Sequence, residues 1–211
     1  MTSSSLAGLT ATACSTERAL PEPRVNTDRV RELISQLLVA LGEDPTRDGL
    51  TGTPARVASW WSTFLSAEAA APATVFAESH LSGQLVVVGG ISVWSLCEHH
   101  LLPMHLRVAA GYVPAGEVLG LSKFGRIAQR NSARLQVQER FTRQVAEDLA
   151  AVIGSDDVAV AVRGTHLCMS MRGVRMEAAR TSSLQAGGRF RSDSVLSQQF
   201  LTLAQDEVRP D

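Results

Sequence analysis

Cysteine is scarce in this chain of 211 residues, which carries only Cys14, Cys97 and Cys168. An odd and sparse set of cysteines is a poor disulfide framework and is typical of a reducing compartment. The N-terminus also lacks the basic start and long apolar stretch of a secretory signal. We therefore expect a cytoplasmic protein.

A charge excess is missing as well, because 20 basic residues face 21 acidic ones and the net charge is −1. No general basic surface is present to attract nucleic acid, so we expect no nucleic-acid partner. No apolar run approaches the about 20 residues of a membrane span, so we expect no membrane partner either. With 45% hydrophobic and 19% charged residues, the composition is that of an ordinary globular chain with one large or two small domains.

The residue composition and the pattern of apolar residues change along the chain and divide it into three regions. Residues 1–25, rich in Ser, Thr and Ala and closing with Pro21 and Pro23, are predicted to be a flexible tail in which Cys14 is inert. Residues 26–73 read as a helical segment, and residues 74–211 as the main domain, in which most of the candidate functional residues described below lie.

The helical segment is predicted to hold two helices. Apolar residues recur at helical spacing from Val30 to Leu41, with Asn26 or Thr27 as N-cap and Gly42 as the stop. A second apolar stripe follows Thr53-Pro54, a cap residue before a proline at the first helical position. Its two tryptophans fit the helical period, so we expect them in the core.

The rest of the chain alternates strand-like and helix-like stretches. LVVVGGISVWSL, LRVAAGYVP and VLGLSK read as strands, FGRIAQRNSAR and QVQERFTRQVAEDLAAVIG as helices, and DVAVAVRG and THLCMSMRGV as a strand pair joined near Gly164. This order favours an α+β fold, an antiparallel sheet backed by helices.

A metal-ligand pattern lies in two of these segments. Cys97 and His100 have the Cys-x-x-His spacing that lets a thiolate and an imidazole reach one ion from a single turn, and Cys168 is the other cysteine of the folded part. Three ligands leave a position for water, which favours a catalytic zinc ion over a four-ligand structural one. Buried core thiols are the remaining alternative. If the three residues hold an ion, His99 and His166 would be spare imidazoles beside it, suited to proton transfer.

Polar residues suited to an anion gather in two further places. Ser122, Lys123 and Arg126 follow a strand at a predicted helix start, and Arg172 and Arg175 follow the second metal segment. A capped helix with solvated basic residues is the plain alternative. Glu139, with Gln138 before it, begins another helix, where a surface carboxylate is the ordinary expectation.

Six segments together carry a family resemblance: TPARVA, CEHHLLP, GYVP, VLGLSKFGRIA, LQVQERFTRQVA and THLCMSMRGV. In this order and at these spacings they resemble the GTP cyclohydrolase I family, from about Val30 to Ala204.

The resemblance implies the tunnelling fold, in which the antiparallel sheets of several subunits join into a barrel surrounded by helices. Such proteins are homo-oligomers, usually decamers of two five-membered rings, with active sites at subunit interfaces. The residues matching the family's zinc ligands are Cys97, His100 and Cys168.

The resemblance also implies how GTP is bound. Glu139, with Gln138 beside it, matches the residues that hold the guanine. The residues that match the family's triphosphate ligands lie on several segments, and one of them comes from a neighbouring subunit. They are Ser122, Lys123, Arg126, Arg172 and, from the neighbour, Arg56.

The implied reaction is hydrolysis and rearrangement of GTP to 7,8-dihydroneopterin triphosphate and formate, the first step of pterin and tetrahydrofolate biosynthesis. Water activated by zinc attacks C8, and His166 protonates a ring nitrogen. His99 and Ser122 are the candidates for moving protons during the rearrangement of the ribose.

Departures from the family pattern cluster near the first metal segment. Met104, His105 and Leu106 replace an aromatic pair and a glycine, Ala109 stands where a polar residue is common, and Arg163 stands where an acidic residue is common. No ligand is lost by these changes. They motivate one rival to the cyclohydrolase, a paralogue that stops at the ring-opened formamide or uses another purine. A non-catalytic zinc-stabilised scaffold is a second rival, but it predicts loss of the spare catalytic groups, and His99, His166 and Glu139 are all present.

Overall fold

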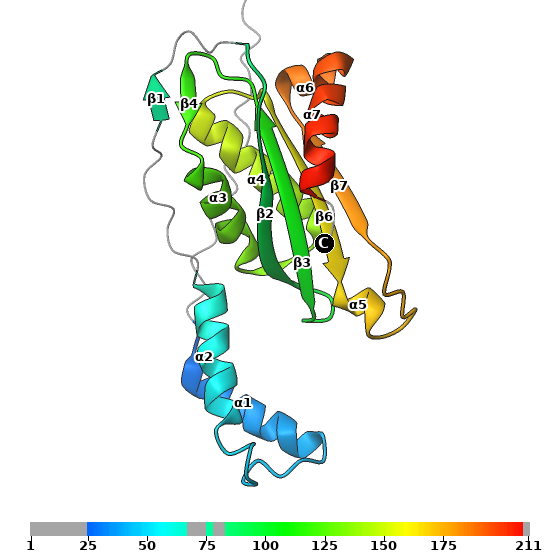
Figure 1. The fold of residues 1–211 in the computed structure, drawn as a ribbon. Helices are drawn as coiled ribbons and strands as arrows, with labels where there is room; N and C mark the ends of the chain where they lie inside the picture. Colours follow the sequence, from blue (N-terminus) through cyan, green and yellow to red (C-terminus); the bar gives the residue numbers. More distant parts are fainter. Residues whose placement is uncertain (1–24, 67–74, 78–82, 209–211) are drawn as a thin grey trace, which may run out of the picture.

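The computed structural model describes residues 25–66, 75–77 and 83–208. Within these ranges the order of elements is α1 (Thr27–Ala40), α2 (Thr53–Leu65), β1 (Val75–Ala77), β2 (Val86–Cys97), β3 (Pro103–Tyr112), β4 (Glu117–Leu119), α3 (Ser122–Ser132), β5 (Leu135–Gln136), α4 (Gln138–Ile153), β6 (Val158–His166), α5 (Leu167–Ser170), β7 (Thr181–Ala186), α6 (Gly188–Ser192) and α7 (Ser194–Glu207) (Figure 1). The α+β class is confirmed. The predicted tail lies outside the described residues except for Val25. None of the described helices is both long and apolar enough to cross a membrane.

The first two helices form a hairpin that lies beyond one end of the sheet in Figure 1. Asn26 caps α1, its Oδ1 accepting a hydrogen bond of 2.9 Å from the Arg29 N–H, as predicted. Gly42 follows the helix with a φ of +84°, a conformation that glycine adopts without strain. Helix α1 therefore begins and ends at the residues that the capping signals indicated.

The prediction that both tryptophans are core residues is wrong for the single chain. Trp60 is 46% exposed and stacks on Phe64 with ring centroids 5.3 Å apart, while Trp61 is half-buried. A helical period shows which face of a helix is apolar, and α1 offers too little surface to cover that face completely.

The main sheet has the strand order β5-β2-β3-β6-β7. Its long strands pair antiparallel as predicted, but β5 runs parallel to β2, with Leu96 opposite Leu135 and Cys97 opposite Gln136. The sheet is therefore mixed. This short parallel pair arises because the chain returns through α3 to the end of β2, which places Gln136 beside the first predicted metal ligand.

The predicted strand pair around Gly164 is also wrong. β6 runs through Gly164, which faces Leu106 on β3, and ends at His166, which faces Met104. Its antiparallel partner on the other side is β7, and the Leu-Cys-Met-Ser segment turns into the short helix α5 instead. The glycine is not a turn residue. A Cβ there would lie 2.1 Å from the amide oxygen of Gln138, so its missing side chain makes room for that of Gln138.

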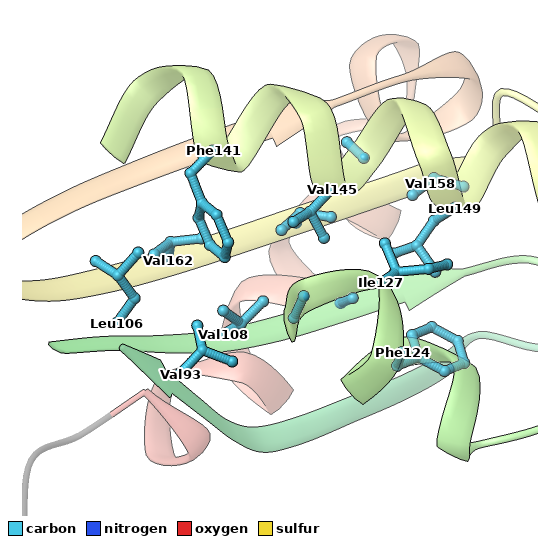
Figure 2. Close-up of a cluster of buried hydrophobic side chains, with 14 of the residues drawn as sticks. Val93, Leu106, Val108, Phe124, Ile127, Phe141, Val145, Leu149, Val158 and Val162 are labelled. Carbon is cyan, nitrogen blue, oxygen red and sulfur yellow. The ribbon is translucent and has the colours of Figure 1, made fainter. Parts of the chain in front are cut away.

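Helices cover both faces of the sheet (Figure 1). Between the sheet and the pair α3 and α4 lies the larger core, drawn in Figure 2, whose fully buried side chains include Leu106, Val108, Phe124, Phe141 and Leu149. Burying one such side chain contributes about 1.5–3 kcal/mol. On the opposite face α6 and α7 cover a second cluster that includes Phe190 and Phe200. Both faces of the sheet are therefore packed against helices, and its end near Cys97 and His166 carries the side chains of the predicted site.

Candidate metal centre and substrate site

The end of β2 folds into a tight turn that carries two of the predicted ligands. The backbone carbonyl of Cys97 accepts hydrogen bonds from the N–H groups of His100 and Leu101, at 3.3 and 2.8 Å. Leu101 has a φ of +55°, a left-handed conformation that closes the turn. As a result the Nδ1 atom of His100 lies 3.8 Å from the Sγ atom of Cys97.

The third predicted ligand arrives from a different strand. β3 pairs with both β2 and β6, so the end of β6 comes beside the end of β2, and α5 then begins directly after His166. Within α5, Cys168 brings its sulfur close enough that the ligand atoms of Cys97, His100 and Cys168 all lie within 4.8 Å of one another. Among the described residues this is the one group of three or more such side chains that could hold a metal ion.

The donor set fits a zinc ion. Ligand atoms around a tetrahedral zinc lie about 3.5–4 Å apart, given Zn–S and Zn–N bonds of about 2.3 and 2.1 Å. Burial raises the pKa of the Cys168 thiol, and the neighbouring sulfur of Cys97 raises it further. Two adjacent thiolates are therefore unfavourable without a cation between them, and a divalent ion would supply that charge.

The two spare histidines differ in their surroundings. His99 is exposed, with its Nδ1 atom 4.0 Å from Cys97 Sγ, outside the group of three. His166 is half-buried, and burial lowers its pKa while the carboxylate of Glu139 acts in the opposite direction. A histidine with a lowered pKa is neutral near pH 7 and can accept as well as pass on a proton.

The first turn of α4 faces this site with three consecutive side chains. Gln138 is buried and contacts His166, with 2.8 Å between its Oε1 atom and the imidazole Nε2 atom. Glu139 is exposed and close enough to His166 to influence its pKa. Arg140 forms an ion pair with Glu98, which directly follows the ligand Cys97 in the β2 turn.

The pair of Arg140 and Glu98 is part of a larger network beside the metal group. The Arg140 Nε–H donates to the Gln136 side chain at 2.9 Å, and the Glu98 N–H donates to the Gln136 backbone carbonyl at 3.0 Å. The hydrogen bond from Arg140 holds the pKa of the Glu98 carboxyl below its usual range. The turn that presents His100 is thereby tied to α4.

Sequence reasoning missed the roles of Glu98, Gln136 and Arg140. They stand inside the CEHH and QVQER segments, but nothing in either segment signals a partner 42 residues away. Only the parallel pairing of β2 and β5 brings them together.

The predicted triphosphate residues on α3 lie at the other end of the sheet. Phe124 on α3 packs on Tyr112, with ring centroids 5.8 Å apart. Tyr112 is the last residue of β3 and lies eight residues along that strand from Met104, which pairs with His166. Eight residues of strand span about 26 Å. Ser122 and Arg126 are exposed on α3 and Lys123 is buried there, so one chain does not bring these three residues to the metal group.

The two remaining predicted anion ligands are also separated. Arg172 lies just beyond α5, close enough to Cys168 for its charge to oppose the rise that burial causes in the pKa of that thiol. Arg56 is on α2 and donates to the Gly49 carbonyl at 3.2 Å and to Thr53 Oγ1 at 2.8 Å. A single chain therefore brings together Arg172, Glu139 and the metal group, and leaves Arg56 on the helical hairpin.

Comparisons with known proteins point to one family. The family model of GTP cyclohydrolase I matches residues 30–205. Three curated relatives, each named GTP cyclohydrolase 1, are from Deinococcus radiodurans (38% identical, over 90% of this chain and 93% of that protein), Hyperthermus butylicus (42%, over 83% and 89%) and Bacillus subtilis (37%, over 84% and 95%).

Proposed function

The chain belongs to the GTP cyclohydrolase I family of hydrolases, and from that premise we propose that it converts GTP to 7,8-dihydroneopterin triphosphate and formate with a bound zinc ion. This reaction would be the first step of pterin and tetrahydrofolate biosynthesis in the cytoplasm. The observation that carries the proposal is the group of Cys97, His100 and Cys168, with both a spare imidazole and a carboxylate beside it.

Zinc would be held by the two thiolates and the imidazole of that group. When bound, it supplies Lewis-acid activation of water for hydrolysis at C8 of the guanine. A second hydrolysis would release C8 as formate, after which the ribose rearranges and the ring closes with loss of water. The proton transfers of these steps and the binding of GTP fall to side chains of the protein.

Glu139 is proposed to bind the guanine through its N–H edge. A carboxylate accepts charge-assisted hydrogen bonds from the ring N–H and the amino group, and adenine lacks this pair of donors. An exposed carboxylate at the first turn of α4, close to His166, suits this contact.

His166 is proposed to pass a proton to the imidazole ring of the guanine as that ring opens. His99, exposed next to the metal ligands, is proposed to move protons during rearrangement of the ribose. Ser122 shares this task in the proposal. Because Ser122 lies on α3, at the other end of the sheet, it would come from another copy of the chain.

The triphosphate is proposed to be gripped by residues of several copies in a homo-oligomer, a decamer in which the subunit sheets join into the barrel of the tunnelling fold. Arg172 would come from the chain that holds the zinc, and a neighbouring copy would supply Lys123 and Arg126, with Arg56 from a further surface. Several cations suit a ligand whose charge is about −4, because fewer would leave much of that charge unpaired.

One assay tests the reaction: purified zinc-loaded protein with GTP, followed by measurement of formate and of pterin fluorescence. We expect both products in equal amounts. A ring-opened formamide without pterin would support the paralogue with an altered outcome, and no turnover with intact zinc binding would support the scaffold. Either result would overturn the proposal.

Replacing a ligand tests the metal. Cys168→Ser should abolish turnover and lower the bound zinc, because the two remaining ligands hold the ion weakly. Elemental analysis of the purified variant measures this, with Ser170→Ala, on the same short helix, as a control that should retain zinc. Full zinc content in Cys168→Ser would contradict the ligand assignment.

A further inference from the structure

Gln138 is a buried polar residue whose side chain is completely hydrogen-bonded. Only 1% of it is exposed, although it begins a helix beside the site. Its amide nitrogen donates to the backbone carbonyls of Val162 and Thr181, at 3.2 and 3.1 Å, and to Ser183 Oγ at 3.0 Å. These bonds leave the amide no N–H for a substrate.

The same bonds determine which way the amide points. Backbone carbonyls only accept hydrogen bonds, so the nitrogen of the amide must face Val162 and Thr181. The amide oxygen therefore faces His166, at 2.8 Å from Nε2. Because this oxygen only accepts, the proton of the neutral imidazole lies on Nε2, and Nδ1 carries the lone pair.

Two further features hold the amide in place. Gly164 leaves the space that the amide oxygen occupies, since a Cβ there would lie 2.1 Å from that oxygen. Ser183 Oγ lies 2.7 Å from Thr142 Oγ1, and Thr142 Oγ1 donates to the Gln138 carbonyl at 2.8 Å. Side chain and backbone of Gln138 are thus both fixed from α4 and from β7.

We propose that Gln138 is a positioning residue, which holds the neutral ring of His166 in the tautomer with the proton on Nε2 and so makes Nδ1 the nitrogen that serves the substrate. This inference deepens the proposed function and rests on it for the role of His166. It replaces the expectation that Gln138 itself contacts the guanine.

The direct test reads the tautomer. We would label the zinc-loaded protein with 15N-histidine, identify His166 among the five histidines with a His166→Asn sample, and record solid-state 15N spectra. The parent should show a protonated Nε2 and a bare Nδ1, and Gln138→Met should lose this single form. Asn131→Leu is the matched control, because Asn131 is also buried with two donated hydrogen bonds but does not contact His166.

Kinetics distinguish a positioning residue from a substrate ligand. In Gln138→Met we expect kcat to fall about 100-fold with KM within about threefold, the pattern of a misplaced proton relay, which takes up a proton on Nδ1 before it passes that proton to the guanine. The inhibition constant of a GTP analogue with carbon in place of N7 should not change. Should Gln138→Met fail to fold, Gly164→Ala keeps Gln138 but places a Cβ 2.1 Å from its amide oxygen and 2.9 Å from His166 Nε2, which separates the two groups and should give the same loss of kcat.

Three results would overturn the proposal: an unchanged tautomer in Gln138→Met, a tenfold weaker binding of the analogue, or an equal loss of kcat in Asn131→Leu. Failure of the proposed function would look different. A parent protein that does not turn over GTP would leave the tautomer measurement intact, and that measurement decides the role of Gln138.

Discussion

Glu139 and Gln138 are neighbours in the sequence, but their surroundings give them different tasks. Glu139 is exposed beside His166, while Gln138 is buried below it. A side chain that binds substrate must have free hydrogen-bonding atoms, and of these two residues only Glu139 lies exposed. The contrast is a property of single positions on a helix, because successive residues point about 100° apart.

Glu139→Gln should weaken GTP binding by about 1–3 kcal/mol, because the change keeps the shape of the side chain and removes its charge. Titration of the zinc-loaded protein with an unreactive GTP analogue measures the effect. Glu147→Gln, an exposed change on the same helix, should leave binding unchanged. Binding as tight as that of the parent would show that Glu139 is a plain surface carboxylate.

At the scale of elements, the first turn of α4 organises the site. Gln138 contacts His166 and Arg140 binds Glu98 in the turn of the metal ligands. Groups that orient metal ligands without touching the ion still influence its affinity, typically by about 10–100-fold.

Arg140→Gln should therefore raise the zinc dissociation constant about 10–100-fold, since the turn that carries His100 loses its tie to α4. Competition with a chromophoric chelator measures the constant. Arg143→Gln is the control, because Arg143 pairs with Glu147 on the exposed side of the same helix. Equal zinc affinity in both variants would mean that the ion pair with Glu98 does not orient the ligands.

The turn after α1 gives a prediction for pH. Hydrogen bonds from the Thr46 hydroxyl and backbone N–H, at 2.7 and 2.8 Å, lower the pKa of the Asp44 carboxyl. An acid with a lowered pKa in the folded state stabilises that state above its unfolded value, about 3.9, and this contribution is lost as the pH falls through the folded pKa.

Asp44→Asn should consequently lower the melting temperature at pH 7 and make progressively less difference below about pH 3.9. Thermal unfolding of parent and variant across this range tests the prediction. Asp48→Asn removes a charge from the same loop without touching these hydrogen bonds, and its effect should be smaller. A difference for Asp44→Asn that grows in acid would contradict the sign.

Local signals in the sequence predicted part of this arrangement. The Cys-x-x-His spacing was enough to predict that the ligand atoms of Cys97 and His100 lie close together, because a single turn positions both residues. Helical periods located α1 to α4. Strand pairing between distant segments was not readable in the same way. Gly164 is an example. In the sequence alone this glycine indicated a turn, because nothing there shows that the side chain of Gln138 occupies the space that a Cβ would fill.

At the scale of the whole molecule, one chain holds only part of the proposed site. Glu139, Arg172 and the metal group lie together, and Arg56 lies on the helical hairpin. Two inactive variants can therefore complement each other if their changes fall on different chains of one site.

Arg56→Ala and Glu139→Ala should each be nearly inactive, and a mixture allowed to exchange subunits should regain a fraction of the activity. The mixture of Arg172→Ala and Glu139→Ala is the control. It should regain none, because both residues belong to the same chain at each site. A fully active monomer of Arg56→Ala would contradict both the shared site and the assembly.

The position of α7 late in the chain has a consequence for folding during synthesis on the ribosome. Phe200 covers the face of the sheet at Gly111, so closely that a Cβ there would lie 2.7 Å from its ring. On the ribosome, Phe200 appears 41 residues after Ala159 of the same cluster. At about 5–20 residues per second this is a delay of about 2–8 seconds. Throughout that interval the side of the nascent sheet that α7 later covers has no partner from its own chain.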